Sequence, residues 1–161
     1  MTTTPREVPP VLVREATPAD LAPIHHLIAA AGLPLAGLDD AAHVWVAEVA
    51  RTIVGTAALE RHGTADAPTF LLRSAAVDPA WRGHGVGSAL TAAALAHVDD
   101  AGAPVALLTE TAAGYFPRFG FTAVARDRLP AALAASAELR GACPASAHAL
   151  LRLFTPTTEG R

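Results

Sequence analysis

Seven consecutive residues, Arg82 to Ser88, combine an arginine with three glycines in the order Arg-Gly-His-Gly-Val-Gly-Ser. They lie between an apolar run typical of a buried strand and an amphipathic helical pattern. The start of a helix leaves backbone N–H groups unpaired and carries the positive end of the helix dipole. Glycines let the backbone close around a phosphate, and an arginine adds a charged fork for its oxygens. The pattern therefore predicts an anion site for a phosphate or a pyrophosphate.

Two common nucleotide-binding patterns do not fit this loop. The dinucleotide pattern G-x-G-x-x-G fails because Ser88 or Leu90 stands where its last glycine belongs. A Walker loop requires a lysine, and all twelve basic residues of the chain are arginines. The absence of lysine also excludes a lysine Schiff base and a lysine general base. The loop must therefore hold its anion with arginine, backbone amides or both.

The remaining sequence predicts the elements that position the loop. Strands are predicted at 11–15, 43–50, 53–61, 69–77, 105–109, 121–125 and 147–154, and helices between Thr17 and Gly32 and at 37–42, 86–99, 111–119 and 131–139. An early hairpin followed by a strand–helix–strand unit predicts mixed strand directions. We therefore expect a single α/β domain over residues 11–154, with a disordered lead at 1–10 and a flexible tail at 155–161.

The composition excludes several classes of function. The chain has 161 residues, a formal net charge of −3, no basic run and only eight aromatic residues (two Trp, one Tyr and five Phe), so no nucleic-acid partner is expected. No apolar run approaches the roughly 18 residues of a membrane span. The histidines lack metal-ligand spacing, so no metal is expected. A single cysteine, Cys143, excludes an intramolecular disulfide and fits a reducing compartment, which predicts a cytoplasmic protein.

Three segments together resemble one known family. Arg82 to Gly87 directly follows strand–Asp–Pro and resembles R-x-x-G-x-G, the pyrophosphate-binding motif of the GNAT acetyltransferases. Ala75 to Gly83 resembles the bulged strand and turn of that family, and Tyr115 to Phe121 resembles its late helix and the Gly-Phe pair that enters the next strand. The resemblance covers about residues 11–154. It implies a mixed, mostly antiparallel central sheet flanked by helices, with acetyl-CoA bound in the splay between the fourth and fifth strands.

A narrower likeness concerns two kinds of short bacterial GNAT proteins. Leu71 to Ser74, Leu107 to Thr109 and Cys143 to Ala147 look like the arsenic-resistance-associated N-acetyltransferases and the N-acetylglutamate synthase-like proteins. This implies acetylation of a small amino acid or an amino-acid-like amine, including arsenical ones. The alternatives are a protein N-terminus, an antibiotic amine, or a sensor that binds CoA without turnover. A single soft ligand is a poor arsenic trap, so Cys143 is interpreted as structural. The resemblance is also compatible with a homodimer of this chain.

The family's direct mechanism assigns roles to the matching positions. A backbone N–H of the bulged strand, here that of Ala75, would stabilise the oxyanion while the amine attacks the thioester. The N–H of Val77 would pair with the pantetheine arm. The cofactor-binding residues implied by the resemblance are Ala75, Ala76, Val77, Arg82, Gly83, His84, Gly85, Val86, Gly87, Ser88 and Phe116. For His84, the alternative is a solvated turn residue.

The expected catalytic acid departs from the family pattern. Many members carry a tyrosine four residues before the late Gly-Phe pair, and here that position is Phe116. Tyr115 stands one residue earlier, and one helical residue turns a side chain by about 100°. Tyr115 is therefore only a weak candidate for the catalytic acid, and the alternative is that its side chain has a packing role. The acidic base of some members is also missing, because its place is Leu71.

The lack of an evident base favours an acceptor that is partly neutral at pH 7. An α-amine with a pKa of about 7.7–8.0 is roughly one-tenth neutral there, whereas a lysine side chain is well under a thousandth neutral. By position and charge, Glu60 is the candidate base or ammonium anchor, and Arg73 is the candidate partner of an acceptor carboxylate. Thr109 is a further candidate substrate contact. The structural alternatives are a Glu60–Arg73 ion pair and a loop-capping Thr109.

Overall fold

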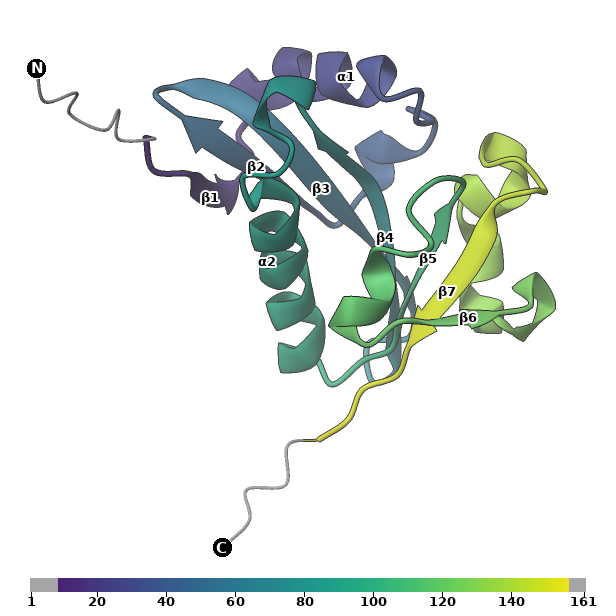
Figure 1. Cartoon of the computed structure of the whole chain (residues 1–161). Helices are drawn as coiled ribbons and strands as arrows, with labels where there is room; N and C mark the ends of the chain where they lie inside the picture. The colour runs from purple at the N-terminus through teal and green to yellow at the C-terminus, as the bar shows by residue number, and fades with distance from the viewer. Residues whose placement is uncertain (1–8, 157–161) are drawn as a thin grey trace, which may run out of the picture.

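The computed structural model describes residues 9–156, in which seven strands form one mixed sheet (Figure 1). The strands are β1 (Leu12–Glu15), β2 (His43–Val49), β3 (Thr52–Gly63), β4 (Pro68–Val77), β5 (Val105–Thr109), β6 (Thr122–Val124) and β7 (His148–Arg152). Their order is β1-β2-β3-β4-β5-β7-β6; β4 and β5 are parallel, and the other neighbours are antiparallel. The expected sheet is confirmed. Most of the predicted lead (1–10) and tail (155–161) lies outside the described residues.

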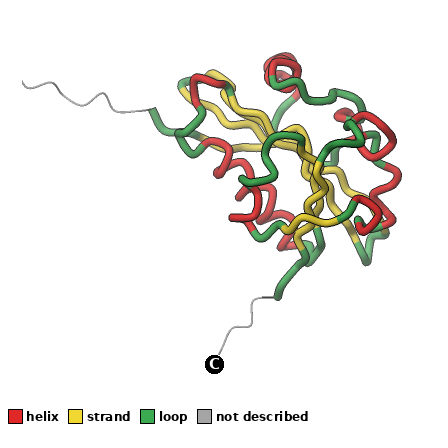
Figure 2. The backbone as a smooth tube through the Cα atoms, turned by 45° about the vertical axis from the view of Figure 1, so that its right-hand side comes forward, coloured by secondary structure: helices red, strands yellow, loops and turns green. Residues whose placement is uncertain are grey.

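Two α-helices, α1 (Leu21–Ala30) and α2 (Val86–Asp100), pack on opposite faces of the sheet (Figure 2). Side chains alternate along β2, so Trp45 joins the core beneath α2 while Val46 packs with Ile28 of α1. A third cluster around Leu133 covers the sheet near β5 and β7. Within residues 9–156, no helix is both long and apolar enough to cross a membrane.

Three predicted helices are reduced to short turns. The segment 37–42 keeps a 3-10 turn at Leu38–Asp40, and 111–119 keeps one at Phe116–Phe119. A regular helix through 111–119 is blocked because Pro117 has no N–H to donate and clashes with the preceding turn. The predicted helix at 131–139 is divided into a 3-10 turn, Ala131–Ala135, and a π-helical turn, Glu138–Ala142. The extended Ser136 interrupts it, with ψ of 138°.

The sheet opens between β4 and β5. These strands pair only at Phe70–Val105 and Leu71–Ala106 and then diverge. Just beyond, the β3–β4 register shifts so that Ser74 and Ala75 together lie opposite one β3 residue, which is a β-bulge. Ser74 has φ of 56°, a left-handed conformation that few non-glycine residues adopt. The bulge and the splay together create a gap beside the first turn of α2.

Candidate functional site

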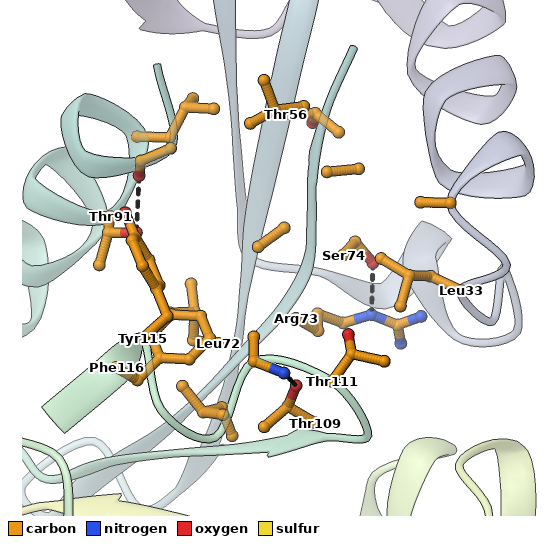
Figure 3. A pocket seen from close by; sticks show the side chains of 18 of the residues that line it. Leu33, Thr56, Leu72, Arg73, Ser74, Thr91, Thr109, Thr111, Tyr115 and Phe116 are labelled. Carbon is orange, nitrogen blue, oxygen red and sulfur yellow. Dashed lines mark hydrogen bonds between the residues drawn. The ribbon is translucent and has the colours of Figure 1, made fainter. Parts of the chain in front are cut away.

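A cavity of about 880 Å³ occupies the splay between β4 and β5. Its walls come from the loop after α1 (31–34), the bulged part of β4 (72–77), the glycine loop with the start of α2, the end of β5 with its loop (107–112), and parts of the segment 138–147. Figure 3 shows Tyr115 and Phe116 on one side of the cavity and Arg73, Ser74 and Leu33 on the other. A cavity of this size accommodates a cofactor arm together with a small second substrate.

The glycine loop closes one end of this cavity. Gly83 and Gly85 both have φ of 79°, and Gly85 is the N-cap of α2. A Cβ at either position would meet no atom within 4 Å, so these glycines are required for the backbone conformation and not for space. Arg82 and the first three residues of α2 also line the cavity. The unpaired N–H groups of this helix start and the adjacent guanidinium form a surface that can bind an anion.

Two residues that were predicted to contact a ligand, His84 and Thr109, make local contacts within the protein. The ring of His84 lies 5.3 Å from that of Trp81, and its Nδ1 is 3.0 Å from the carbonyl oxygen of Arg82. His84 does not line the cavity, so this placement favours the turn-residue alternative over a cofactor contact. Thr109 lines the cavity, but its Oγ1 accepts a 3.0 Å hydrogen bond from the N–H of Ala112. The loop-capping alternative for Thr109 is therefore present in the structure.

The bulge of β4 places an unpaired backbone segment in the cavity wall. Ala75 is exposed, whereas its neighbours Ser74 and Ala76 are buried. Ala75 has no register partner on β3, and β5 has already diverged. Together with Ala76 and Val77 it lines the cavity. An N–H group at such a position can stabilise negative charge that develops on a bound carbonyl oxygen.

Tyr115 reaches across the cavity to the start of α2. Its Oη lies 3.0 Å from Oγ of Ser88, and its ring carries the guanidinium of Arg118 at 4.5 Å. Phe116 is 6% exposed, packs edge-on against Phe121 at 5.7 Å and also lines the cavity. Tyr115 has helical dihedral angles, with φ of −84° and ψ of −43°, so its side chain diverges from that of Phe116, yet both residues line the cavity. Tyr115 thus points into the site that the sequence pattern disfavoured for it.

Glu60 and Arg73 form the ion pair that was the structural alternative. Nη1 of Arg73 donates to Oε2 of Glu60 at 2.8 Å, and both side chains are almost fully buried. The other oxygen of Glu60 lies 2.8 Å from Nε2 of His62. Arg73 also donates to the Pro34 carbonyl oxygen and to Oγ of Ser74, both at 3.1 Å.

The roles expected for this pair therefore meet a geometric obstacle. Arg73 borders the cavity, but all three of its nitrogens are engaged within the protein. Glu60 does not line the cavity, and both of its oxygens have close partners. An acceptor amine would have to displace His62 or Arg73 to reach Glu60. This arrangement favours a structural role for Glu60 and disfavours Arg73 as a carboxylate anchor.

Sequence reasoning missed a second carboxylate, Glu138. It begins the π-helical turn, is 4% exposed and lines the cavity. Burial raises the pKa of Glu138 to about 7, although the nearby guanidinium of Arg73 opposes this shift. The backbone N–H of Cys143 donates to the carbonyl oxygen of Glu138 at 3.1 Å, and Cys143 also lines the cavity. The alanine-rich sequence around Glu138 has no spacing motif that signals chemistry; a lone acidic residue in an apolar segment is the only signal.

A family model described as Acetyltransferase (GNAT) domain matches residues 40–123, more than half of the chain. The match includes the bulge, the glycine loop and Tyr115. The chain belongs to the GNAT acetyltransferase family. The acetyl-CoA-dependent acyl transfer expected from the sequence is the reaction of this family, with acetyl-CoA as its co-substrate. No curated protein matches the chain.

Three solved structures share the GNAT fold of this chain. N-acetylglutamate synthase from Neisseria gonorrhoeae, complexed with coenzyme A and N-acetyl-glutamate, is 22% identical with a TM-score of 0.74, and the match covers 91% of this chain and 35% of that one. Rv2747 from Mycobacterium tuberculosis, in complex with CoA and NLQ, is 24% identical with a TM-score of 0.70, covering 89% and 99%. Arabidopsis thaliana Naa50, in complex with the bisubstrate analogue CoA-Ac-MVNAL, is 18% identical with a TM-score of 0.72, covering 89% and 99%.

These likenesses establish the GNAT fold and leave the acceptor open. The chain spans about a third of the length of the Neisseria synthase. All three structures contain CoA or a CoA conjugate, but the other ligands differ, from N-acetyl-glutamate to a peptide-like analogue. None of the reported matches connects the chain to arsenic. Within residues 9–156, no group of three or more His, Cys, Asp or Glu side chains could hold a metal ion.

Proposed function

We propose that this GNAT domain transfers the acetyl group of acetyl-CoA to the α-amine of a small amino acid or an amino-acid-like compound. The observation that carries the proposal is a single cavity that joins the glycine loop, the bulge of β4 and the buried carboxylate of Glu138. A cavity that holds both reactants allows the amine to attack the thioester directly in a ternary complex.

The proposed cofactor pose follows the cavity from one end to the middle. The pyrophosphate would bind Arg82 and the N–H groups of Gly83 to Ser88, with the exception of His84, which does not line the cavity. The pantetheine arm would run along Ala76 and Val77 in the splay between β4 and β5. The thioester carbonyl would then accept a hydrogen bond from the N–H of Ala75. Removal of a comparable oxyanion donor in other enzymes costs about 2.7–4 kcal/mol.

Tyr115 is proposed as the acid that protonates the leaving thiolate of CoA. Its hydroxyl lies 3.0 Å from Oγ of Ser88 at the start of α2, close to the loop proposed for the pyrophosphate. The hydroxyl of Ser88 can donate to Tyr115 while the tyrosine proton is directed elsewhere, because either oxygen can be the donor. The thiolate therefore has a proton source on the cavity wall even though Phe116 occupies the usual family position.

One experiment distinguishes the proposed acceptor from a protein N-terminus, an antibiotic amine and a sensor without turnover. Release of free CoA thiol should be measured with acetyl-CoA and a panel that contains glutamate and other amino acids, arsenical and phosphinic analogues, N-terminal peptides and aminoglycosides. We expect turnover with one or more of the amino-acid-like amines. Turnover confined to peptides or aminoglycosides would replace the proposed acceptor. Tight CoA binding without turnover on any amine would favour a sensor. The arsenical acceptor, the cytoplasmic location and the homodimer stay predictions.

Cys143 is not expected to carry the acetyl group. Burial and the neighbouring carboxylate of Glu138 together raise the pKa of the Cys143 thiol to about 11. The thiolate is the nucleophilic form, and only about one thiol in a thousand would be ionised at pH 8. Incubation with acetyl-CoA alone should therefore leave the intact mass of the protein unchanged, with Cys143→Ala as the matched control. A stoichiometric acetyl adduct that is lost in Cys143→Ala would contradict direct transfer.

A further inference from the structure

The wall of the cavity contains a buried carboxylate, Glu138, whose charge is poorly compensated. Glu138 is 4% exposed, and its Oε1 lies 3.7 Å from Nε of Arg73. The charge of Arg73 is already matched at 2.8 Å by Glu60. The charged or titratable groups that face Glu138 are thus Arg73 from β4, Glu60 from β3 and the thiol of Cys143. Two carboxylates share one guanidinium, and Glu138 is the more distant of the two.

This carboxylate lies next to the bulge. Nε of Arg73 donates to Oγ of Ser74 at 3.1 Å and is also the nitrogen closest to Glu138 in their ion pair. Ser74 immediately precedes Ala75, whose N–H is the proposed oxyanion donor. The same guanidinium nitrogen therefore connects Glu138 to the residue before the acyl site. An acceptor held in the cavity at this point would have the thioester on one side and the carboxylate of Glu138 on the other.

We propose that Glu138 is the general base of the transfer and receives a proton from the ammonium group of the acceptor. The inference rests on the proposed function, because it assigns a role within that reaction. Glu138 suits the role better than Glu60, since it lines the cavity and lies 3.7 Å from Arg73, whereas Glu60 is paired with Arg73 at 2.8 Å and does not line the cavity. Burial raises the pKa of Glu138 to about 7, close to the value at which a base is most effective at neutral pH.

In the proposed step one proton passes through Glu138 and one through Tyr115. The carboxylate of Glu138 removes one proton from the bound ammonium and leaves a neutral amine. The amine nitrogen attacks the thioester carbonyl, a C–N bond forms, and the C–S bond then breaks. The thiolate of CoA takes the proton of Tyr115, and the second proton lost by the nitrogen restores the phenol. Glu138 releases its proton to solvent when the amide product leaves.

The test compares Glu138→Gln with the wild type and with Asp127→Asn. Glutamine keeps the size of the side chain and removes its charge, and Asp127 is an exposed acidic residue outside the cavity. With the best acceptor of the amine panel, kcat/KM at pH 7 should fall by about 100-fold or more in Glu138→Gln. Asp127→Asn should retain wild-type activity. CoA affinity should be unchanged in both variants.

Two pH measurements distinguish a base from a merely structural residue. The wild-type kcat/KM should decline as the pH falls below about 7, whereas in Glu138→Gln the decline should begin near pH 8, because without the base only the neutral form of the α-amine reacts. At pH 9 an α-amine with a pKa of about 8 is mostly neutral and needs no base, so the deficit should shrink to less than about tenfold. A melting temperature of Glu138→Gln at pH 8 no lower than that of the wild type excludes unfolding. Glu138→Gln should be at least as stable as the wild type at pH 8, because a buried acid with a raised pKa destabilises the fold as the pH rises from 4.5 to 7.

The outcomes separate the base from the reaction itself. Wild-type turnover with the expected loss in Glu138→Gln supports both the acetyl transfer and the role of Glu138 as its base. Wild-type turnover with unchanged rate and pH profile in Glu138→Gln overturns the base alone. A deficit that is the same at pH 7 and pH 9 also overturns it, because a base is needed less as the amine loses its proton. Absence of turnover in the wild type on every amine would overturn the transfer and the base together.

Discussion

Replacing Gly87 with leucine should weaken CoA binding by about 100-fold, or about 2.8 kcal/mol. Gly87 lies in the first turn of α2 and lines the cavity. A Cβ placed there would be 3.4 Å from Oη of Tyr115 and 3.7 Å from Cγ2 of Val77, which is ordinary contact. The rest of the leucine side chain would then occupy the space proposed for the pyrophosphate. Titration calorimetry with CoA measures the effect.

The control for this substitution is Ala92→Leu on the same helix. Ala92 is exposed and does not line the cavity, so its replacement adds the same kind of bulk away from the site. Leucine is a better helix former than glycine, so Gly87→Leu should not unfold α2. Circular dichroism of both variants checks this point. Unchanged CoA affinity in Gly87→Leu would place the cofactor elsewhere and remove the basis of the proposed pose.

The cofactor end of the site was predictable because local sequence determines it. Gly83 and Gly85 need a left-handed backbone, and the helical pattern from Val86 shows where the unpaired N–H groups must lie. The strand before Asp78 ends at Val77 as expected, and the bulge follows the family pattern. Each of these features depends on residues that are neighbours in the chain.

The acceptor end was not predictable because it depends on contacts between distant segments. The register of β3 with β4 pairs Glu60 with Leu71 and Ala58 with Arg73, which brings Glu60 and Arg73 to the same face. Sequence alone does not specify that register. Glu138 reaches the same place from a π-helical turn that no periodicity indicates.

Tyr115 shows a different limit, because the rotation between two neighbouring helical residues does not say which of their side chains enters the cavity. In a regular helix this rotation is about 100° per residue. Tyr115 has helical dihedral angles, with φ of −84° and ψ of −43°, and its side chain does diverge from that of Phe116. The Tyr115 hydroxyl lies 3.0 Å from Oγ of Ser88, while Phe116 packs in the core. A departure from a family motif by one residue therefore does not settle which side chain enters the site.

Replacing Arg73 with methionine should lower the free energy of unfolding by about 3–5 kcal/mol. The side chain of Arg73 is 0% exposed, and its three nitrogens bond to Glu60, Ser74 and the Pro34 carbonyl. Its loss would leave two buried carboxylates, Glu60 and Glu138, without a shared cation. For a domain of this size the melting temperature should drop by on the order of 10 °C. Thermal and urea unfolding measure the change.

The companion variants separate the buried pair from a general effect of losing an arginine. Arg61→Met removes an exposed arginine from β3 and should change stability by less than about 0.5 kcal/mol. Adding Glu60→Gln to Arg73→Met should recover part of the loss, because one of the two uncompensated charges disappears. A melting temperature of Arg73→Met equal to that of the wild type would mean that Arg73 does not neutralise this cluster. Glu138 would then have no charged neighbour to fix it beside the bulge.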